Sequence, residues 1–295
     1  MLALRILEVI FPLLVIGGVG YLYGRRHRPE MNATNRLNLE IFVPALIFSA
    51  LSDRTFDLGT YVPLTLAATA VVLLAGVVAW PLARLTGFQA KTFVPPMMFC
   101  NSGNMGLPLT VLAFGEAALP AALVVFLVEN VLHFTVGIWL LDHRAKLVAV
   151  FRQPIVIAAA LGLAFSFTGT RLHPTLALPI EMLGQISIPL MLFALGVRLS
   201  TADLGEWRIG ALAAVAAPAI GIALALLLVP LFGLQGIYAG TLVLFGALPP
   251  AVLNFMLAEK YHQEPAKVAS IVIVGNLFAV VAIPLALAYV LPRYG

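Results

Sequence analysis

Ten apolar segments, each close to the length of a membrane-spanning helix, follow one another along the chain and are separated by short polar or proline- and glycine-containing stretches. Their ranges are 4–24, 36–52, 59–86, 92–115, 117–141, 154–170, 179–199, 207–232, 236–259 and 265–291. A helix of about 20 apolar residues crosses the hydrocarbon core of a bilayer. The pattern therefore predicts an all-α polytopic membrane protein with ten transmembrane helices.

A polar stretch interrupts the fourth segment where a lipid-facing helix would carry leucine. It reads Cys100-Asn101-Ser102-Gly103-Asn104-Met105-Gly106-Leu107-Pro108. Proline removes a backbone donor and clashes with the preceding turn, and glycine weakens a helix, so we expect the helix to break here. Interrupted backbone at membrane depth persists only where it is buried in protein or lines a wet cavity. The stretch therefore indicates a transport site.

The second half of the chain repeats features of the first at an offset of about 145 positions. Pro44 in the second segment corresponds to Pro189 in the seventh, and Asn130 in the fifth corresponds to Asn276 in the tenth. Because a repeat of five spans is odd in number, its second copy enters the membrane upside down. We therefore expect a 5+5 inverted repeat with interrupted fourth and ninth helices, a recurrent design of secondary transporters. The two repeats would comprise residues 1–141 and 154–295.

The orientation of the chain follows from its basic residues. Of the 17 lysines and arginines, 13 fall in the odd-numbered connections: Arg25, Arg26, Arg28, Arg36, Arg84, Lys91, Arg144, Lys146, Arg152, Arg198, Arg208, Lys260 and Lys267. The positive-inside rule places these connections in the cytoplasm and both termini outside. It also explains the net charge of +4 without a nucleic-acid partner.

The interruption of the ninth segment matches that of the fourth and suggests how an anion could be bound. Where a helix restarts, it offers unpaired backbone N–H groups and the positive end of its dipole. The candidate substrate-binding residues at the two breaks are Asn101, Ser102, Asn104 and Asn254, and the candidate break residues are Gly103, Gly106, Pro108, Pro249 and Pro250. The alternative is that the prolines only kink packed helices and the asparagines join helices together.

Glu129, near the centre of the fifth segment, is the most informative single charge. A carboxylate at that depth is normally paired, protonated or bound to a cation. We therefore consider Glu129, together with Asn130 and its repeat-related Asn276, as a candidate for proton or sodium coupling. The alternative is a protonated, hydrogen-bonded glutamate without a role in transport, and His133 on the same helix face is assigned a structural role.

Several motifs are absent from the sequence. It contains no phosphate-binding loop, no His-Glu-x-x-His or Cys/His cluster for a metal, and no Gly-x-Ser-x-Gly nucleophile elbow. We therefore expect neither an enzyme nor a metal or organic cofactor.

The chain resembles the auxin efflux carrier family in the stretch Asn101 to Pro108, in the stretch Ala247 to Asn254 and in its ten segments. That family includes bacterial permeases similar to plant PIN exporters and belongs to the bile-acid/auxin transporter superfamily. The resemblance implies that helices four and nine break at prolines and cross. It implies a crossover domain from residues 59–141 and 207–291, and a panel domain from residues 4–52 and 154–199 that is often used for dimerisation.

The resemblance also implies an organic-anion substrate, with Asn101, Asn104 and Asn254 as the motif asparagines. The connection from His143 to Gln153 is short, so the long cytosolic loop of many plant members is absent. We therefore expect a protein of the bacterial cytoplasmic (inner) membrane, and auxin itself is not favoured among auxin-like carboxylates.

The leading interpretation is an alternating-access carrier of small carboxylates, in contact with the lipid bilayer and forming a homodimer through the panel domain. Two alternatives stay open: a sodium-coupled symporter of bile-acid type, and a channel or sensor on the same scaffold.

Overall fold

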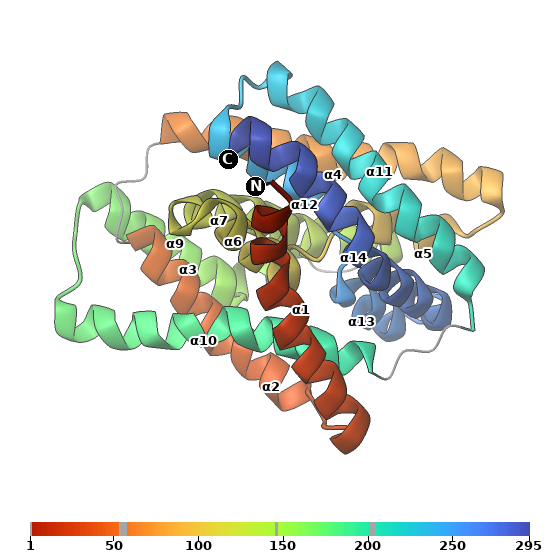
Figure 1. The fold of residues 1–295 in the computed structure, drawn as a ribbon, viewed down its shortest axis with the longest axis horizontal. Coiled ribbons are helices and arrows are strands. Elements are labelled where there is room, and N and C mark those ends of the chain that lie inside the picture. The colour runs from red at the N-terminus through yellow and green to blue at the C-terminus, as the bar shows by residue number, and fades with distance from the viewer. Residues whose placement is uncertain (1, 53–57, 145–146, 201–204) are drawn as a thin grey trace. The chain divides into compact units, whose positions relative to one another are not determined.

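The computed structural model describes residues 2–52, 58–144, 147–200 and 205–295 (Figure 1). Within these ranges the chain is helical, and no strand forms apart from one isolated bridge between two extended segments. Arg54 and Lys146, two of the basic residues that bear on orientation, lie outside the described ranges. The all-α prediction is confirmed for the described part of the chain.

Six helical stretches in the described ranges are long and apolar enough to cross a membrane. Five are single helices: α1 (Leu2–His27), α4 (Leu58–Thr86), α10 (Pro174–Leu199), α11 (Trp207–Leu231) and α14 (Pro265–Tyr294). The sixth runs through η3 (Glu116–Ala118), α7 (Leu119–Leu132), the π-helical η4 (His133–Gly137) and α8 (Ile138–Leu141). The chain is therefore a polytopic membrane protein.

The other four apolar segments coincide with shorter helices. The second is α2 (Asn32–Leu37), η1 (Asn38–Phe42) and α3 (Val43–Ser52) in direct succession, and the sixth is α9 (Pro154–Thr168), which follows the 3-10 helix η5 (Leu147–Arg152). The fourth comprises α5 (Ala90–Met98), η2 (Ser102–Gly106) and α6 (Leu107–Phe114), and the ninth comprises α12 (Gly236–Gly246) and α13 (Val252–Lys260). Both of these are divided in two, as predicted.

The chain forms two compact units. Unit 1 comprises Met1–Ile10, Tyr61–Ala145 and Ala202–Gly295, and unit 2 comprises Phe11–Thr60 and Lys146–Thr201. All the interrupted helices of the fourth and ninth segments belong to unit 1.

In unit 1, α11 and α14 run side by side, and both contact α5 and α12 (Figure 1). Apolar residues from α5, α11 and α14 fill this core, and Phe93, Phe99, Ile209 and Ile271 are at most 1% exposed. Because lipid is as apolar as these side chains, close van der Waals packing between the helices favours this arrangement.

The end of α12 lies directly against α11. A Cβ atom on Gly246 would stand 2.5 Å from the carbonyl oxygen of Gly221, so the two backbones touch and only glycine fits. This contact fixes the place where the ninth segment leaves its helix.

In unit 2, α3 packs along α9 and α10 (Figure 1). Glycines also bring α1 close to α10, because a Cβ on Gly20 would meet the backbone of Phe193 and one on Gly24 would meet Ser200. The small-residue motif Gly20-x-x-x-Gly24 is therefore used within the chain.

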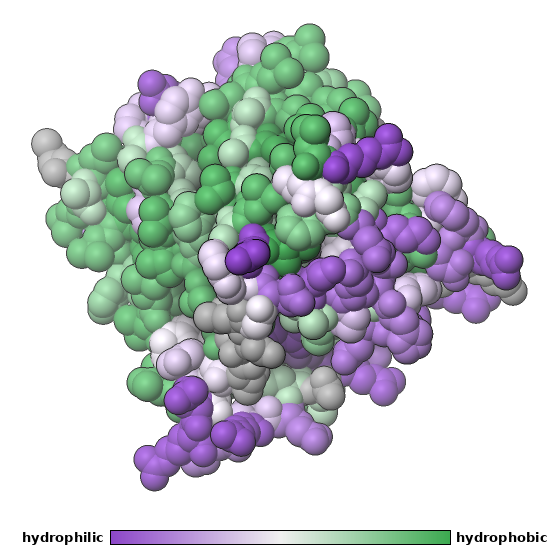
Figure 2. All heavy atoms as spheres, turned by 90° about the vertical axis from the view of Figure 1, so that its right-hand side faces the viewer, coloured by the Kyte–Doolittle hydropathy of each residue, from purple (hydrophilic) through white to green (hydrophobic). Residues whose placement is uncertain are grey.

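Large apolar side chains remain exposed along the long helices. Leu4, Met182, Leu227 and Leu285 are examples, each more than half exposed. Figure 2 shows hydrophobic residues over much of one face and hydrophilic residues gathered apart from them. Such a surface is expected for helices in contact with lipid rather than water.

Candidate functional site

Both interrupted segments change from helix to non-helical backbone near prolines. Helix α5 contains Pro95 and Pro96 and ends at Met98, and Phe99 is extended with φ −111° and ψ 105°. Helix α12 ends at Gly246, before Pro249 and Pro250. A proline favours extended backbone in the residue before it, which explains why α12 does not continue through Leu248 into Pro249. Pro95 and Pro96 lie within α5, so its end three residues later at Phe99 does not follow from this rule.

The two extended segments pair with each other. Cys100 and Pro250 form an antiparallel bridge. The Ala251 N–H donates to the Phe99 carbonyl at 2.9 Å, and the Asn101 N–H donates to the Pro249 carbonyl at 2.7 Å. The pairing satisfies backbone groups that lipid could not satisfy.

Asn101 and Asn276 extend this pairing with their side chains. The Asn101 amide donates to Asn276 Oδ1 at 2.9 Å, and the Asn276 amide donates to the Pro250 carbonyl at 3.1 Å and to the Val272 carbonyl at 2.8 Å. Both asparagines are 3% exposed. A predicted substrate residue and a predicted coupling residue therefore meet at the bridge, where they hold the backbone of the break.

Asn254 supports the bridge from the first turn of α13. Its Nδ2 donates to the Phe99 and Ala251 carbonyls at 3.0 Å each. Its Oδ1 is buried and makes no hydrogen bond of good geometry within the described residues, and its side chain interacts with that of His133. Asn254 thus uses its donors for the break.

Glu129 reaches the bridge from α7. Its Oε2 accepts a hydrogen bond from the Cys100 N–H at 3.3 Å, and its Oε1 lies 3.5 Å from Cys100 Sγ. Glu129 is buried, and it lines a small, water-sized cavity together with Cys100, Met97, Ala217 and Leu248. A carboxyl group in this position contacts the bridge directly and also borders this cavity.

The remaining predicted residues lie near the break with different roles. Ser102 is buried, and its N–H donates to the Cys100 carbonyl at 2.8 Å. Gly103 and Asn104 are half-buried in the first turn of η2. Pro108 stands at the start of α6, where a helix does not need its N–H.

Gly106 contacts the ninth segment beside the break, whereas Asn130 bonds only within its own helix among the described residues. A Cβ atom on Gly106 would stand 2.9 Å from side-chain atoms of Leu248 and Phe245, so Gly106 allows η2 to approach the ninth segment. The Asn130 amide donates to Phe126 in its own helix at 3.3 Å. The structure therefore brings Asn101, Asn254, Asn276 and Glu129 together, but shows no bond from Asn130 to this group among the described residues.

Two contributors to the site were not among the candidate binding or coupling residues. Cys100 is a member of the bridge, and the His133 ring stacks on Phe99 with centroids 4.1 Å apart. The position of Cys100 directly before the polar motif was the available signal. The partners of His133 lie in other segments, so the local sequence carries no signal for this stack.

A family model described as "Membrane transport protein" matches the chain over residues 5–150 and 145–287. The chain belongs to this family. This is the auxin efflux carrier family that the motif and the segment pattern indicated. This member of the auxin efflux carrier family is a membrane transporter, and its two helix breaks pair with each other.

Relatives of this auxin efflux carrier family member cover nearly its whole length. A Rhizobium meliloti (strain 1021) protein named "Putative malonate transporter" is 28% identical over 95% of this chain and 94% of its own. An uncharacterized transporter of Methanocaldococcus jannaschii is 22% identical over 97% of this chain and 98% of its own. One of Methanothermobacter thermautotrophicus is 26% identical over 94% of this chain and 96% of its own.

Proposed function

We propose that this protein is a secondary carrier that moves small carboxylates across the bacterial cytoplasmic membrane by alternating access, with malonate as the first substrate to test. The pairing of two helix breaks at Cys100 and Pro250 carries the proposal. Secondary transporters build their sites from discontinuous helices of this kind. The full-length similarity to the Rhizobium relative supports a small dicarboxylate.

The proposal includes ten spans arranged as a 5+5 inverted repeat, with both termini outside. Ten apolar segments coincide with helices, and the interruptions fall in the fourth and the ninth. The fifth and tenth segments support the bridge in related ways: Glu129 contacts Cys100, and Asn276 contacts Pro250. Accessibility of cysteines introduced into the connections would contradict this topology if odd and even connections were labelled from the same side.

The substrate carboxylate would bind at the two helix starts beside the bridge. The first N–H groups of a helix have no partner within it, and they carry the positive end of the dipole. Gly103 and Asn104 occupy the first turn of η2, and Val252 and Leu253 that of α13, and all four are half-buried. Asn101 and Asn254 would hold these starts in place.

Glu129 would couple transport to a proton gradient. Both of its oxygens face Cys100, so the addition of a proton to the carboxyl group changes the contacts of the bridge itself. Sodium coupling is the competing proposal. Uptake driven by a pH gradient in the absence of sodium supports the proton, whereas a strict sodium requirement would establish the symporter.

The two units would supply the moving parts. Residues 59–141 and 207–291, proposed as the crossover domain, fall almost wholly in unit 1, and residues 11–52 and 154–199 of the proposed panel domain fall in unit 2. The crossover domain would move against the panel as an elevator, and the panel would form a homodimer. A monomeric mass for the purified protein in detergent and in lipid nanodiscs would contradict the dimer.

The test of function is the uptake of labelled malonate into liposomes that contain the purified protein. We expect uptake to saturate, to be inhibited by other small carboxylates and to fall in Asn101→Ala. Asn35→Ala, in unit 2, is the control. Absence of malonate uptake by the wild-type protein would refute this substrate, and a large electrical current would indicate a channel instead.

A further inference from the structure

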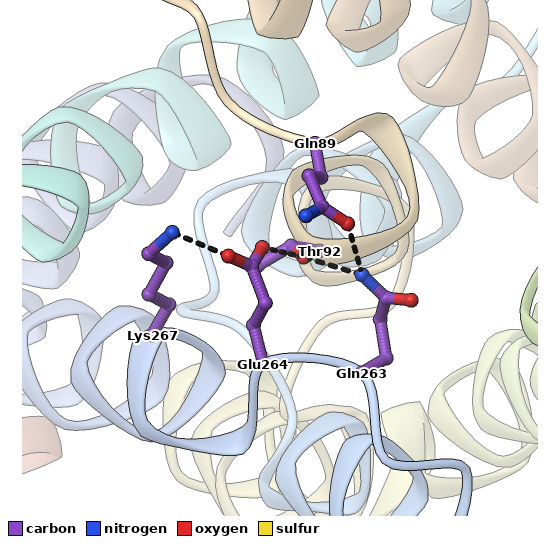
Figure 3. Close-up of polar contacts among 5 residues, drawn as sticks. All are labelled: Gln89, Thr92, Gln263, Glu264 and Lys267. Atoms are coloured by element: carbon purple, nitrogen blue, oxygen red, sulfur yellow. Dashed lines mark hydrogen bonds and ion pairs between the residues drawn. The ribbon is translucent and has the colours of Figure 1, made fainter.

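Five polar residues join the start of α5 to the turn between α13 and α14 (Figure 3). Thr92 Oγ1 donates to Glu264 at 2.5 Å, and Glu264 also pairs with Lys267. The Gln263 amide donates to Thr92 Oγ1 at 2.9 Å and to Gln89 at 2.8 Å. Thr92 is at the centre of this cluster, because its hydroxyl both donates and accepts.

The turn that carries the cluster has an unusual backbone. Glu264 and His262 have positive φ angles of 39° and 52°. Residues other than glycine adopt this region only where surrounding contacts enforce it, and such positions gather at ligand clamps and switches. Backbone bonds cap the two helices here: the Gln263 N–H donates to the Ala258 carbonyl, and the Glu264 carbonyl accepts from the N–H groups of Lys267 and Val268. The side-chain bond from Thr92 to Glu264 ties this turn to α5.

The negative charge of Glu264 stabilises the contacts of this cluster. Burial acts to raise the pKa of the Glu264 carboxyl, but hydrogen bonds from Lys267 and Thr92 and the charge of Lys267 outweigh it. The pKa of Glu264 therefore lies below the ordinary value of a glutamate, and the carboxylate stays ionised at neutral pH.

A cavity begins directly behind the cluster. It is small, with room for about one water molecule rather than for a larger solute. Thr92, Lys91 and Val268 line it near the cluster, and His133 and Asn254 line it near the break. Thr92 thus belongs both to the cluster and to the wall of the cavity.

Among the described residues, His133 Nε2 and Asn254 Oδ1 make no hydrogen bond of good geometry, although the two side chains interact with each other, and both residues line this cavity. Both residues are at most 4% exposed. A buried polar atom is costly unless it is hydrogen-bonded, and water in a polar cavity is the usual partner. Through its Nδ2, Asn254 is also bonded to Phe99, so the cavity ends at the helix break.

We propose that the cluster of Gln89, Thr92, Gln263, Glu264 and Lys267 is a gate over a water path that leads to Asn254 and His133 at the helix break. Water is the molecule that the path admits, because the cavity is of that size and its inner wall offers one acceptor amide and one imidazole nitrogen. When the Thr92 contacts are intact the path is closed to larger solutes. When they break, the turn from His262 to Glu264 moves away and the path opens. Access of water to the break by this path does not depend on which substrate the carrier moves.

The test is the accessibility of cysteines introduced along α14. Val268 and Val272 are both valines, lie one helical turn apart and are buried in the same apolar cluster with Ala258, but only Val268 lines the cavity. We would label Val268→Cys and Val272→Cys with 2-aminoethyl methanethiosulfonate, with the parent protein as the baseline for Cys100. Each would then be combined with Thr92→Val, which removes the central hydroxyl.

We expect slow labelling of Val268→Cys, a clear acceleration when Thr92→Val is present, and only baseline labelling of Val272→Cys with or without it. Glu264→Gln should accelerate labelling in the same way, whereas Glu259→Gln, which alters an exposed carboxylate in the same region, should not. The proposal is overturned if Val268→Cys is as inert as Val272→Cys in every background, or if its rate is unaffected by Thr92→Val and Glu264→Gln. Labelling does not depend on transport, so the result is independent of the malonate proposal.

Discussion

The backbone N–H of Asn101 donates to the carbonyl oxygen of Pro249 at 2.7 Å and so joins the fourth apolar segment to the ninth. Two extended segments, each of which would leave polar backbone unsatisfied in the membrane, satisfy each other. The helix starts that follow, at Ser102 and Val252, are thereby fixed near one another. This arrangement makes the bridge the structural centre of unit 1.

Replacement of Asn276 should destabilise the protein. In Asn276→Leu the Pro250 carbonyl and the Asn101 amide lose their buried partner, and each such loss costs about 1–3 kcal/mol. Thermal unfolding of the detergent-purified variant measures the effect. Asn130→Leu is the matched control, because Asn130 is half-buried and bonds to its own helix, and we expect a change within about 0.5 kcal/mol. Equal destabilisation by the two variants would contradict the role of Asn276.

Replacement of Glu129 should separate exchange from gradient-driven uptake. Glutamine retains an acceptor for the Cys100 N–H but cannot ionise. We expect Glu129→Gln liposomes to exchange internal for external malonate while accumulation driven by a pH gradient is lost. Glu116→Gln alters an exposed glutamate at the start of the same segment and should preserve both activities. Normal pH-driven accumulation in Glu129→Gln would exclude Glu129 as the coupling group.

Glu264 should make the folded protein sensitive to acid. Because its pKa is lowered in the folded state, its stabilising contribution is fully present above the unfolded-state pKa of about 4.3 and is lost as pH falls through the lower folded-state pKa. The melting temperature of the wild type should therefore fall more steeply than that of Glu264→Gln below this pH. The two curves should run parallel above it. Parallel curves throughout the acid range would mean that Glu264 has an ordinary pKa.

Two glycine replacements should have opposite effects. In Gly246→Ala the new methyl group would meet the Gly221 backbone, and overpacking of this kind costs about 1–3 kcal/mol. Gly18 in α1 has open space where a Cβ would stand, so Gly18→Ala should stabilise the helix by about 0.5–1 kcal/mol. Thermal unfolding measures both changes. A stabilised Gly246→Ala variant would show that α11 and α12 are not in backbone contact.

Much of the helical arrangement could be predicted from the sequence, because apolar length and proline position act locally. The breaks follow from Pro249, Pro250 and the polar stretch after Phe99, and the structure places both there. The prediction located the first break over Cys100 to Pro108, whereas the non-helical part is confined to residues 99–101. Gly103 and Gly106 lie in a π-helical turn rather than in a gap.

The partners of the site residues could not be predicted, because they depend on packing between distant segments. Nothing near Asn101 indicates that its amide meets Asn276, and nothing near Thr92 indicates that it meets Glu264. Glu264 lies in the turn immediately before α14, and in the sequence it resembles an ordinary loop carboxylate. Only the fold brings its turn to the start of α5.

The most direct test of the central claim, that an anion binds at the paired helix starts, is the thermal stability of the purified protein with and without malonate. A ligand at a hundredfold excess over its dissociation constant stabilises the folded state by about 2.7 kcal/mol. We expect malonate to raise the melting temperature of the wild type and of Asn35→Asp. In Asn104→Asp the rise should disappear, because a carboxylate placed in the first turn of η2 repels the anion. Equal stabilisation of all three proteins would show that malonate binds elsewhere and would contradict the proposed site.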